Sequence, residues 1–131
     1  MSGSAASLRL AHAVGISRPE AEALLEHASL ELMDAQLSCF TSRHRLGAAV
    51  EAGVISARAV CGLAGVDVDV DGKLEVLLAA AGLLALGEGW RAEARALQHP
   101  QRIDEEEVGH AIVWAREIYI DARLYVMGVG A

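Results

Sequence analysis

The sequence predicts an all-α fold, an up-and-down bundle of four main helices with one short extra helix. Of the 131 residues, 53% are hydrophobic and 22% are charged, which is the composition of a folded domain rather than of a disordered tail. The chain contains 25 Ala and 17 Leu against 2 Pro, a bias toward strong helix formers with small side chains. Apolar residues also recur every three or four positions, which is the period of a helix that buries one face.

The length is that of one ordinary domain, with too few residues for a second core. We expect a single helical-bundle domain over residues 17–131. Residues 1–16 are predicted to form an N-terminal segment that is either a short helix, ending before Gly15, or flexible.

The first main helix is predicted to begin at Arg18, because Ser17 and Glu20 have the spacing of a capping box and Pro19 suits the first turn. Its apolar residues form one stripe with helical spacing: Ala21, Leu24, Leu25, Ala28, Leu32, Ala35 and Cys39. A second apolar stripe lies beside the first: Leu30, Met33, Leu37 and Phe40. We expect so wide an apolar face to pack against more than one neighbour.

Two further main helices are predicted in the middle of the chain. The second follows Thr41 and Ser42 and ends near Gly65, and the glycines at 53 and 62 suggest that another helix approaches it closely. Residues 66–72 alternate Val and Asp, but no partner strand is predicted, so this segment is expected to be a loop. Residues 73–86 form the third helix, which is apolar nearly all round and therefore predicted to be central.

The C-terminal third of the chain is predicted to hold the short helix and the last main helix. The short helix covers residues 90–98, and Pro100 prevents its continuation beyond His99. Asp104 and the three glutamates after it are typical of a helix start. The last helix then places one stripe on its core face: Val108, Ala111, Ile112, Ala115, Ile118, Tyr119, Ala122 and Val126.

The sequence predicts neither a cofactor nor a metal, with calcium left as an open alternative. Asp67, Asp69 and Asp71 followed by glycine match the opening of a calcium loop, but Leu78 occupies the position of the bidentate carboxylate. The preferred interpretation is an acidic helix-entry loop in which Asp71 is the N-cap of the third helix. Cys39 and Cys61 lack CxxC spacing and are interpreted as small buried apolar residues.

Charge disfavours a broad nucleic-acid surface. The net charge is −7, and residues 67–131 contribute most of it with 12 acidic against 6 basic side chains. RNA therefore stays a possible partner that charge does not favour. The N-terminus lacks a basic region followed by an apolar core, so we expect a cytoplasmic protein. The apolar run at residues 76–86 covers about half the length of a membrane span, and no membrane association is expected.

Arg95 and His99 are the candidate catalytic residues. They are four positions apart at the end of the short helix, so we expect them to share one face. The structural interpretation is a cationic last turn that the helix dipole stabilises. The functional interpretation is a pair that handles phosphodiesters, in which the guanidinium stabilises charge on phosphate oxygens and the imidazole moves a proton.

In the order and texture of its helices the chain resembles the HEPN family, small helical domains named for higher eukaryotic and prokaryotic nucleotide binding. Three stretches within residues 17–127 carry the resemblance: the long helix from Arg18, the small-residue helix Gly47–Val60, and His99-Pro100 followed by Ile103–Val108 and the closing helix Ala111–Val126. Many members are metal-independent ribonucleases that dimerise, so that an arginine and a histidine with four to six residues between them meet across the interface.

The resemblance implies a homodimer with Arg95 and His99 at its interface. Three residues separate this pair, and Ala96 stands where the family often has a polar residue, which implies a degenerate or inactive ribonuclease acting through dimerisation or partner binding. The alternative is a non-enzymatic helical adaptor or chaperone-like interaction module, whose acidic second half contacts a basic protein partner.

Overall fold

The computed structural model describes residues 15–67 and 72–128, and within these ranges it contains helices and no strand. The helices are α2 (Arg18–Gln36), α3 (Ser42–Ala64), α4 (Lys73–Leu84), α5 (Glu88–Ala96) and α6 (Glu105–Gly128). The prediction of an all-α bundle with one short helix is therefore confirmed. The helix suggested before Gly15 lies outside the described residues.

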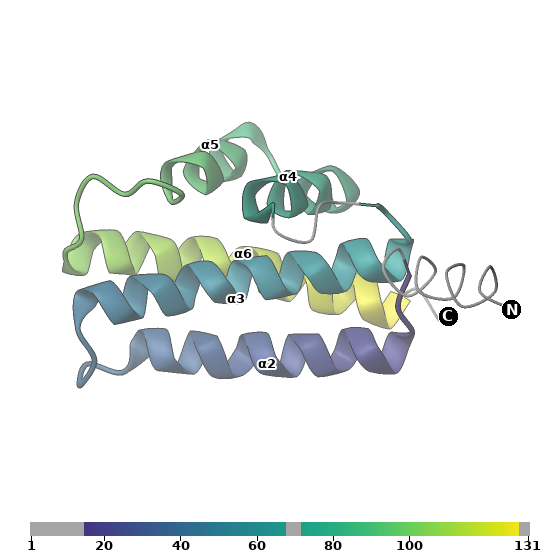
Figure 1. Cartoon of the computed structure of the whole chain (residues 1–131), viewed down its shortest axis with the longest axis horizontal. Coiled ribbons are helices and arrows are strands. Elements are labelled where there is room, and N and C mark those ends of the chain that lie inside the picture. The colour runs from purple at the N-terminus through teal and green to yellow at the C-terminus, as the bar shows by residue number, and fades with distance from the viewer. Residues whose placement is uncertain (1–14, 68–71, 129–131) are drawn as a thin grey trace, which may run out of the picture.

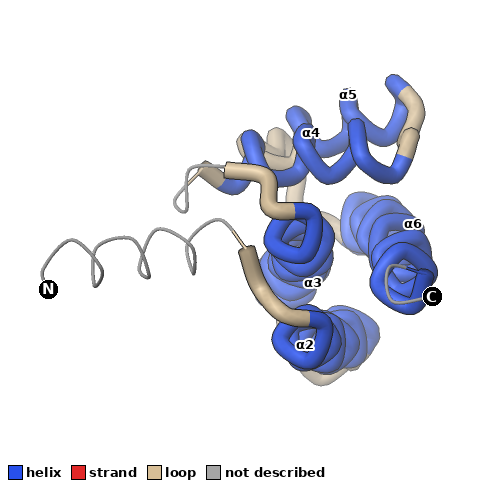
Figure 2. The backbone as a smooth tube through the Cα atoms, turned by 90° about the vertical axis from the view of Figure 1, so that its right-hand side faces the viewer, coloured by secondary structure: helices blue, strands red, loops and turns tan. Residues whose placement is uncertain are grey.

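The long helices α2, α3 and α6 pack side by side, and the shorter α4 and α5 lie across one side of them (Figure 1). Helix α3 runs antiparallel to α2 and in the same direction as α6 (Figure 1). In the view along the long helices, α4 and α5 lie on the side of α3 and α6 that is remote from α2 (Figure 2). The α2 and α6 helices also contact each other, so these three helices surround a common core.

The central helix is α3, and the prediction that the third main helix is central was wrong. Helix α3 packs against α2, α4 and α6 and has the longest run of buried residues in the described chain. Helix α4 is apolar on most sides, but it lies at the outside of the bundle and leaves Leu83 exposed. Uniform apolarity did not identify the centre because the alanine-rich α3 buries its small residues on several sides.

Capping chemistry determines most of the helix ends. The Glu20 amide donates to the Ser17 hydroxyl while the Glu20 carboxylate accepts from the Ser17 amide, as predicted. The Glu107 amide donates to Asp104 Oδ1 at the start of α6. Helix α3 ends at Gly65, whose φ of 73° is the left-handed conformation that glycine adopts without strain.

The ends of α4 differ from the prediction. Its N-cap is Gly72 and not Asp71, and its C-cap is Ala85, which adopts a left-handed φ of 56° before the predicted end at residue 86. The Leu86 amide then donates to the Ala81 carbonyl at 2.9 Å, which allows the Leu86 side chain to return to the core. Helix α4 therefore ends earlier than helix propensity predicted, and the early end goes together with the burial of Leu86.

Two tryptophans join α5 to α6. The Trp90 and Trp114 rings stack with centroids 4.9 Å apart, and each indole N–H donates to the backbone carbonyl of the other residue. Both side chains are buried. A Cβ placed on Gly53 would lie 2.5 Å from the Trp114 ring, so this glycine gives the ring its space against α3. The predicted close approach at position 53 is confirmed.

Arg45 connects three helices at one end of the bundle. Its Nε donates to the Ala35 carbonyl at the end of α2, and its Nη1 lies 2.7 Å from a carboxylate oxygen of Glu105 at the start of α6. Ser42 also donates to Glu105 at 2.8 Å. The hydrogen bonds from Ser42 and Arg45 lower the pKa of the Glu105 carboxyl. Arg45 thus gives a hydrogen bond to a carbonyl in the last turn of α2 that has no partner within the helix, and its contact with Glu105 holds the start of α6 in place.

The two cysteines have different environments. Cys61 is buried as predicted, and this burial raises the pKa of its thiol to about 11. Cys39 is exposed, so the prediction for this residue was wrong. The reason is that α2 ends at Gln36, and the helical stripe on which Cys39 was placed does not extend that far.

Helix α3 is long and apolar enough to cross a membrane by length and composition, with a mean hydropathy of 1.5 over its most apolar window. However, 67% of that window is buried inside the bundle, and a core helix of this kind passes the same test.

Candidate functional site

Arg95 lies in the last turn of α5 and is held by an ion pair. Its Nη1 lies 2.9 Å from a carboxylate oxygen of Glu88, which is two turns earlier on the same helix. Both side chains are at least half exposed, so the contact orients the guanidinium without removing it from water.

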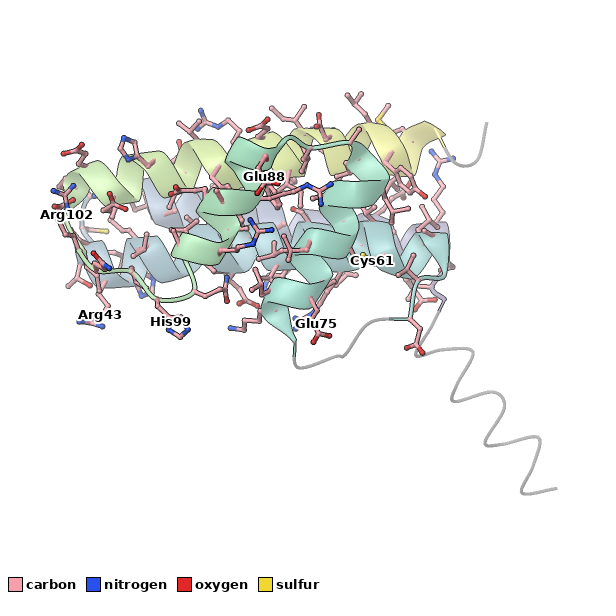
Figure 3. All side chains as sticks on the ribbon, turned by 90° about the horizontal axis from the view of Figure 1, so that it is seen from above. Arg43, Cys61, Glu75, Glu88, His99 and Arg102 are labelled. Carbon is pink, nitrogen blue, oxygen red and sulfur yellow. The ribbon has the colours of Figure 1, made fainter. Side chains whose placement is uncertain are left out.

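His99 lies beyond the end of α5, in an exposed turn. It lines an open pocket of about 310 Å³, whose wall is formed by Glu93, Ala96, Leu97, His99, Pro100, Gln101, Arg102 and Glu107. In the view from above, His99 projects from the edge of the layer that contains α4 and α5 (Figure 3). Arg95 does not line this pocket, so the structure does not bring the predicted pair together around one cavity.

The backbone after Arg95 explains the separation. The amides of Gln98 and His99 donate to carbonyls three residues earlier, those of Arg95 and Ala96. This tight turn advances about 120° per residue instead of the 100° of an α-helix, so side chains four positions apart no longer share a face. The predicted shared face depends on helix continuing to residue 98, whereas α5 ends at Ala96.

The cation in the pocket of His99 is Arg102. Its guanidinium lies 3.4 Å from Asp104 and 3.6 Å from both Glu106 and Glu107, all at the start of α6. Three carboxylates around one guanidinium leave little positive potential for a phosphate in this pocket. The acidic helix start therefore works against binding of a polyanion beside His99.

Among residues 15–67 and 72–128, no three His, Cys, Asp or Glu side chains are grouped as ligands for a metal ion. Of the calcium candidates, Asp67 is exposed, while Asp69 and Asp71 lie outside the described residues.

A set of exposed apolar side chains lies on α2 and α6. We define the α2/α6 face by seven exposed side chains: Leu30, Met33, Leu37, Val113, Ile120, Leu124 and Met127. Their exposed fractions run from 46% for Leu37 to 65% for Val113. Helix α2 packs against two neighbours, α3 and α6, as its wide apolar face predicted, but within this chain its second stripe stays largely exposed.

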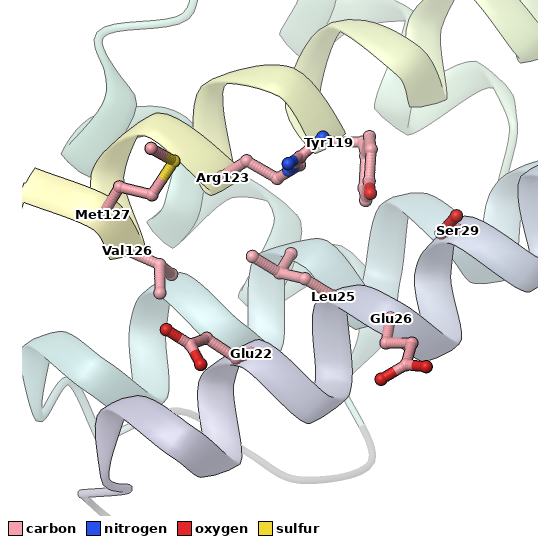
Figure 4. Close-up of a pocket in the computed structure, with 8 residues that line it drawn as sticks. All are labelled: Glu22, Leu25, Glu26, Ser29, Tyr119, Arg123, Val126 and Met127. Atoms are coloured by element: carbon pink, nitrogen blue, oxygen red, sulfur yellow. The ribbon is translucent and has the colours of Figure 1, made fainter.

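The two stripes form one surface because the helices are adjacent. The residues through which α2 and α6 meet line a groove: Glu22, Leu25, Glu26 and Ser29 on α2, with Tyr119, Arg123, Val126 and Met127 on α6 (Figure 4). At 100° per residue, each apolar stripe is centred about a quarter turn from the side of its helix that faces this groove. Since the helices are antiparallel, both quarter turns point to the same side of the pair.

The area of this surface is that of a protein interface. A side chain of this size carries on the order of 100 Å² of apolar surface, so seven of them at about half exposure present roughly 400 Å². An interface of standard size buries about 800 Å² on each partner, somewhat more than half of it apolar. The α2/α6 face thus supplies most of the apolar area that a stable complex needs.

Sequence reasoning found half of this surface. The α2 stripe was identified, without a prediction of which neighbour covers it. The α6 stripe was missed, although residues 113, 120, 124 and 127 are separated by seven, four and three positions, which is helical spacing on the side opposite the core stripe.

Comparison of the chain with family models, curated proteins and solved structures found no match.

Proposed function

We propose that this chain is a non-enzymatic helical interaction domain that binds a protein partner through the α2/α6 face. The observation that carries the proposal is the exposure of seven large apolar side chains on two adjacent helices. An apolar surface of several hundred Å² on a folded chain typically marks a binding surface. Contact of such a surface with water is unfavourable, and a bound partner shields the surface from water.

The rigidity of the site supports the same function. Both helices are anchored through their opposite sides to α3, and Arg45 ties the end of α2 to the start of α6. The exposed side chains therefore lie on helices whose relative position is fixed before a partner arrives, which lowers the entropy cost of binding.

A photoreactive amino acid at position 33 tests this proposal. We expect Met33 substituted in this way to give crosslinked products of discrete mass in cells that produce the chain. The same group at Leu83, an exposed apolar residue of α4 outside the face, should give none. Equal crosslinking from both positions would show that the face has no special role.

A HEPN-like ribonuclease is a second candidate, favoured by one observation: the exposed imidazole of His99 lines a pocket together with a guanidinium, that of Arg102. In this function His99 would move the proton, and Arg95 or Arg102 would stabilise charge on the phosphate.

An RNA-cleavage assay without added metal separates the two functions. We expect neither the parent nor His99→Ala to cleave RNA, because Arg95 is bound to Glu88 and Arg102 is surrounded by carboxylates. The assay includes four proteins at equal concentration: the parent, His99→Ala, Arg95→Ala and Arg102→Ala. If the parent cleaves RNA and His99→Ala does not, the ribonuclease function is supported and the proposal of a non-enzymatic interaction domain is wrong.

A further inference from the structure

We infer that the partner of the α2/α6 face is a second copy of this chain, with α2 of each copy packed against α6 of the other around a two-fold axis parallel to the helices. This inference rests on the proposed function, because it names the partner for the same surface. Its physical basis is the distribution of charge and apolar surface along the two helices.

The two helices carry opposite charges along the groove between them. Helix α2 lines this groove with Glu22 and Glu26, and α6 lines it with Arg123. Arg116 is exposed two turns before Arg123 on α6. Glu26 and Arg123 line the same groove, yet they form no ion pair with each other in the structure (Figure 4). Within the described chain, Arg116 has no salt-bridge partner either. Glu22 pairs with Arg18 on its own helix at 3.1 Å, whereas Glu26 has no salt-bridge partner among the described residues. One surface therefore carries an acidic side, with Glu26 unpaired, and a basic side.

A two-fold axis parallel to the helices brings these opposite charges of the two copies together. Such an axis exchanges the two edges of the face, so that α2 of one copy lies over α6 of the other at the same height along the bundle. Glu22 and Glu26 lie level with Arg123 and Met127 in the groove of one chain, so they also lie level with those residues of the second copy. Acidic side chains then face arginines twice in each dimer.

The apolar residues follow the same correspondence. In the antiparallel pair, the C-terminal half of α2, with Leu30, Met33 and Leu37, lies beside the N-terminal half of α6 (Figure 1). The exchange of edges therefore places these three residues over Val113 and Ile120 of the second copy. The C-terminal half of α2 thus meets apolar residues of the second copy, while Glu22 and Glu26 meet Arg123 together with Leu124 and Met127.

The other possible two-fold axis lies in the face and perpendicular to the helices. It would pack α2 against α2 and α6 against α6 with their directions reversed, so that Glu22 and Glu26 lie over the apolar C-terminal half of α2 in the second copy. Charged side chains that are buried against apolar ones without a partner oppose association. The charge distribution therefore selects the parallel axis.

In this dimer the two copies of α5 do not meet. Helix α5 lies on the side of α3 and α6 that is remote from α2, whereas the α2/α6 face points the other way (Figure 2). Arg95 and His99 of the two chains would consequently lie on opposite outer surfaces. This dimer differs from the one that the family resemblance implies, in which those residues meet.

Charge reversal combined with sedimentation velocity over a range of concentrations tests the inference. We expect the parent chain to dimerise at micromolar concentration. Glu26→Arg and Arg123→Glu should each weaken dimerisation about tenfold, and the double variant should return to within about threefold of the parent. Glu88→Arg, an equal charge change on α5, is the matched control and should leave association unchanged. Stronger association of Glu26→Arg would overturn the arrangement, since it is the result expected for like charges facing each other.

An apolar variant tests the face without reference to its charges. Ile120→Lys should abolish the dimer, while Leu83→Lys on α4 should not. Circular dichroism checks that both variants are as helical as the parent. A parent chain that stays monomeric at about 100 μM would overturn self-association. That result would leave the proposed function intact, because crosslinking at Met33 would then identify a different protein, whereas loss of specific crosslinking would remove the proposed function itself.

Discussion

Replacement of Trp114 by alanine is expected to lower the free energy of unfolding by about 3–5 kcal/mol. The side chain is 3% exposed and lies where α3, α5 and α6 meet, against Gly53 and the Trp90 ring. Its removal leaves a cavity and also removes the indole N–H that satisfies the Trp90 carbonyl. A loss of this size is a large share of the 5–15 kcal/mol that typically stabilises a domain.

Guanidinium unfolding, followed by far-ultraviolet circular dichroism, measures this loss. We expect the midpoint of the transition to fall with little change in its slope. Leu83→Ala is the control, because this exposed leucine of α4 should change stability by less than about 1 kcal/mol. If Trp114→Ala unfolds at the same midpoint as that control, the tryptophan pair does not hold α5 on the bundle.

Local chemistry made much of the fold predictable. The start of α2 depends on Ser17 and Glu20, and the end of α3 on Gly65, all within a few residues of the ends that they fix. The core stripe of α6 was likewise readable, because helical spacing alone indicates which residues share a face. The structure adds Trp114 to that buried face.

The arrangement of the helices was less accessible, because it depends on residues that are distant in sequence. The early end of α4 accompanies the return of Leu86 to the core, and the position of α2 depends in part on Arg45, which bonds to the Ala35 carbonyl. The expected shared face of the candidate pair likewise depended on where a helix ends. A separation of four positions between Arg95 and His99 indicates a shared face only while the helix continues, and α5 ends at Ala96.

The α2/α6 face is a second feature that local sequence patterns could not predict. An apolar stripe in a sequence indicates that something covers it, but not whether the cover is another part of the chain or another molecule. Leu30 and Met33 were predicted to belong to an apolar stripe, and the structure leaves both more than half exposed. The distinction required the positions of α3 and α6, which take up the core face of α2.

Gly53→Ala is expected to destabilise the chain by about 2–3 kcal/mol, although alanine favours a helix by about 1 kcal/mol over glycine. The added Cβ would lie 2.5 Å from Cζ3 and 2.6 Å from Cη2 of Trp114, and this ring cannot retreat because Trp90 stacks against it. The matched control is Gly47→Ala on the same helix, where a Cβ would meet nothing within 4 Å. This control should be neutral or stabilising by up to about 1 kcal/mol.

A double-mutant cycle assigns the cost of Gly53→Ala to the tryptophan ring. In a Trp114→Leu background the smaller side chain leaves room for the new methyl group, so Gly53→Ala should there be neutral or stabilising. The difference between the two backgrounds, measured by guanidinium unfolding, is then at least about 2 kcal/mol. An equal cost in both backgrounds would mean that position 53 needs glycine for a reason other than contact with Trp114. The close packing of α3 against α6 would then depend on the backbone of α3 rather than on this single contact.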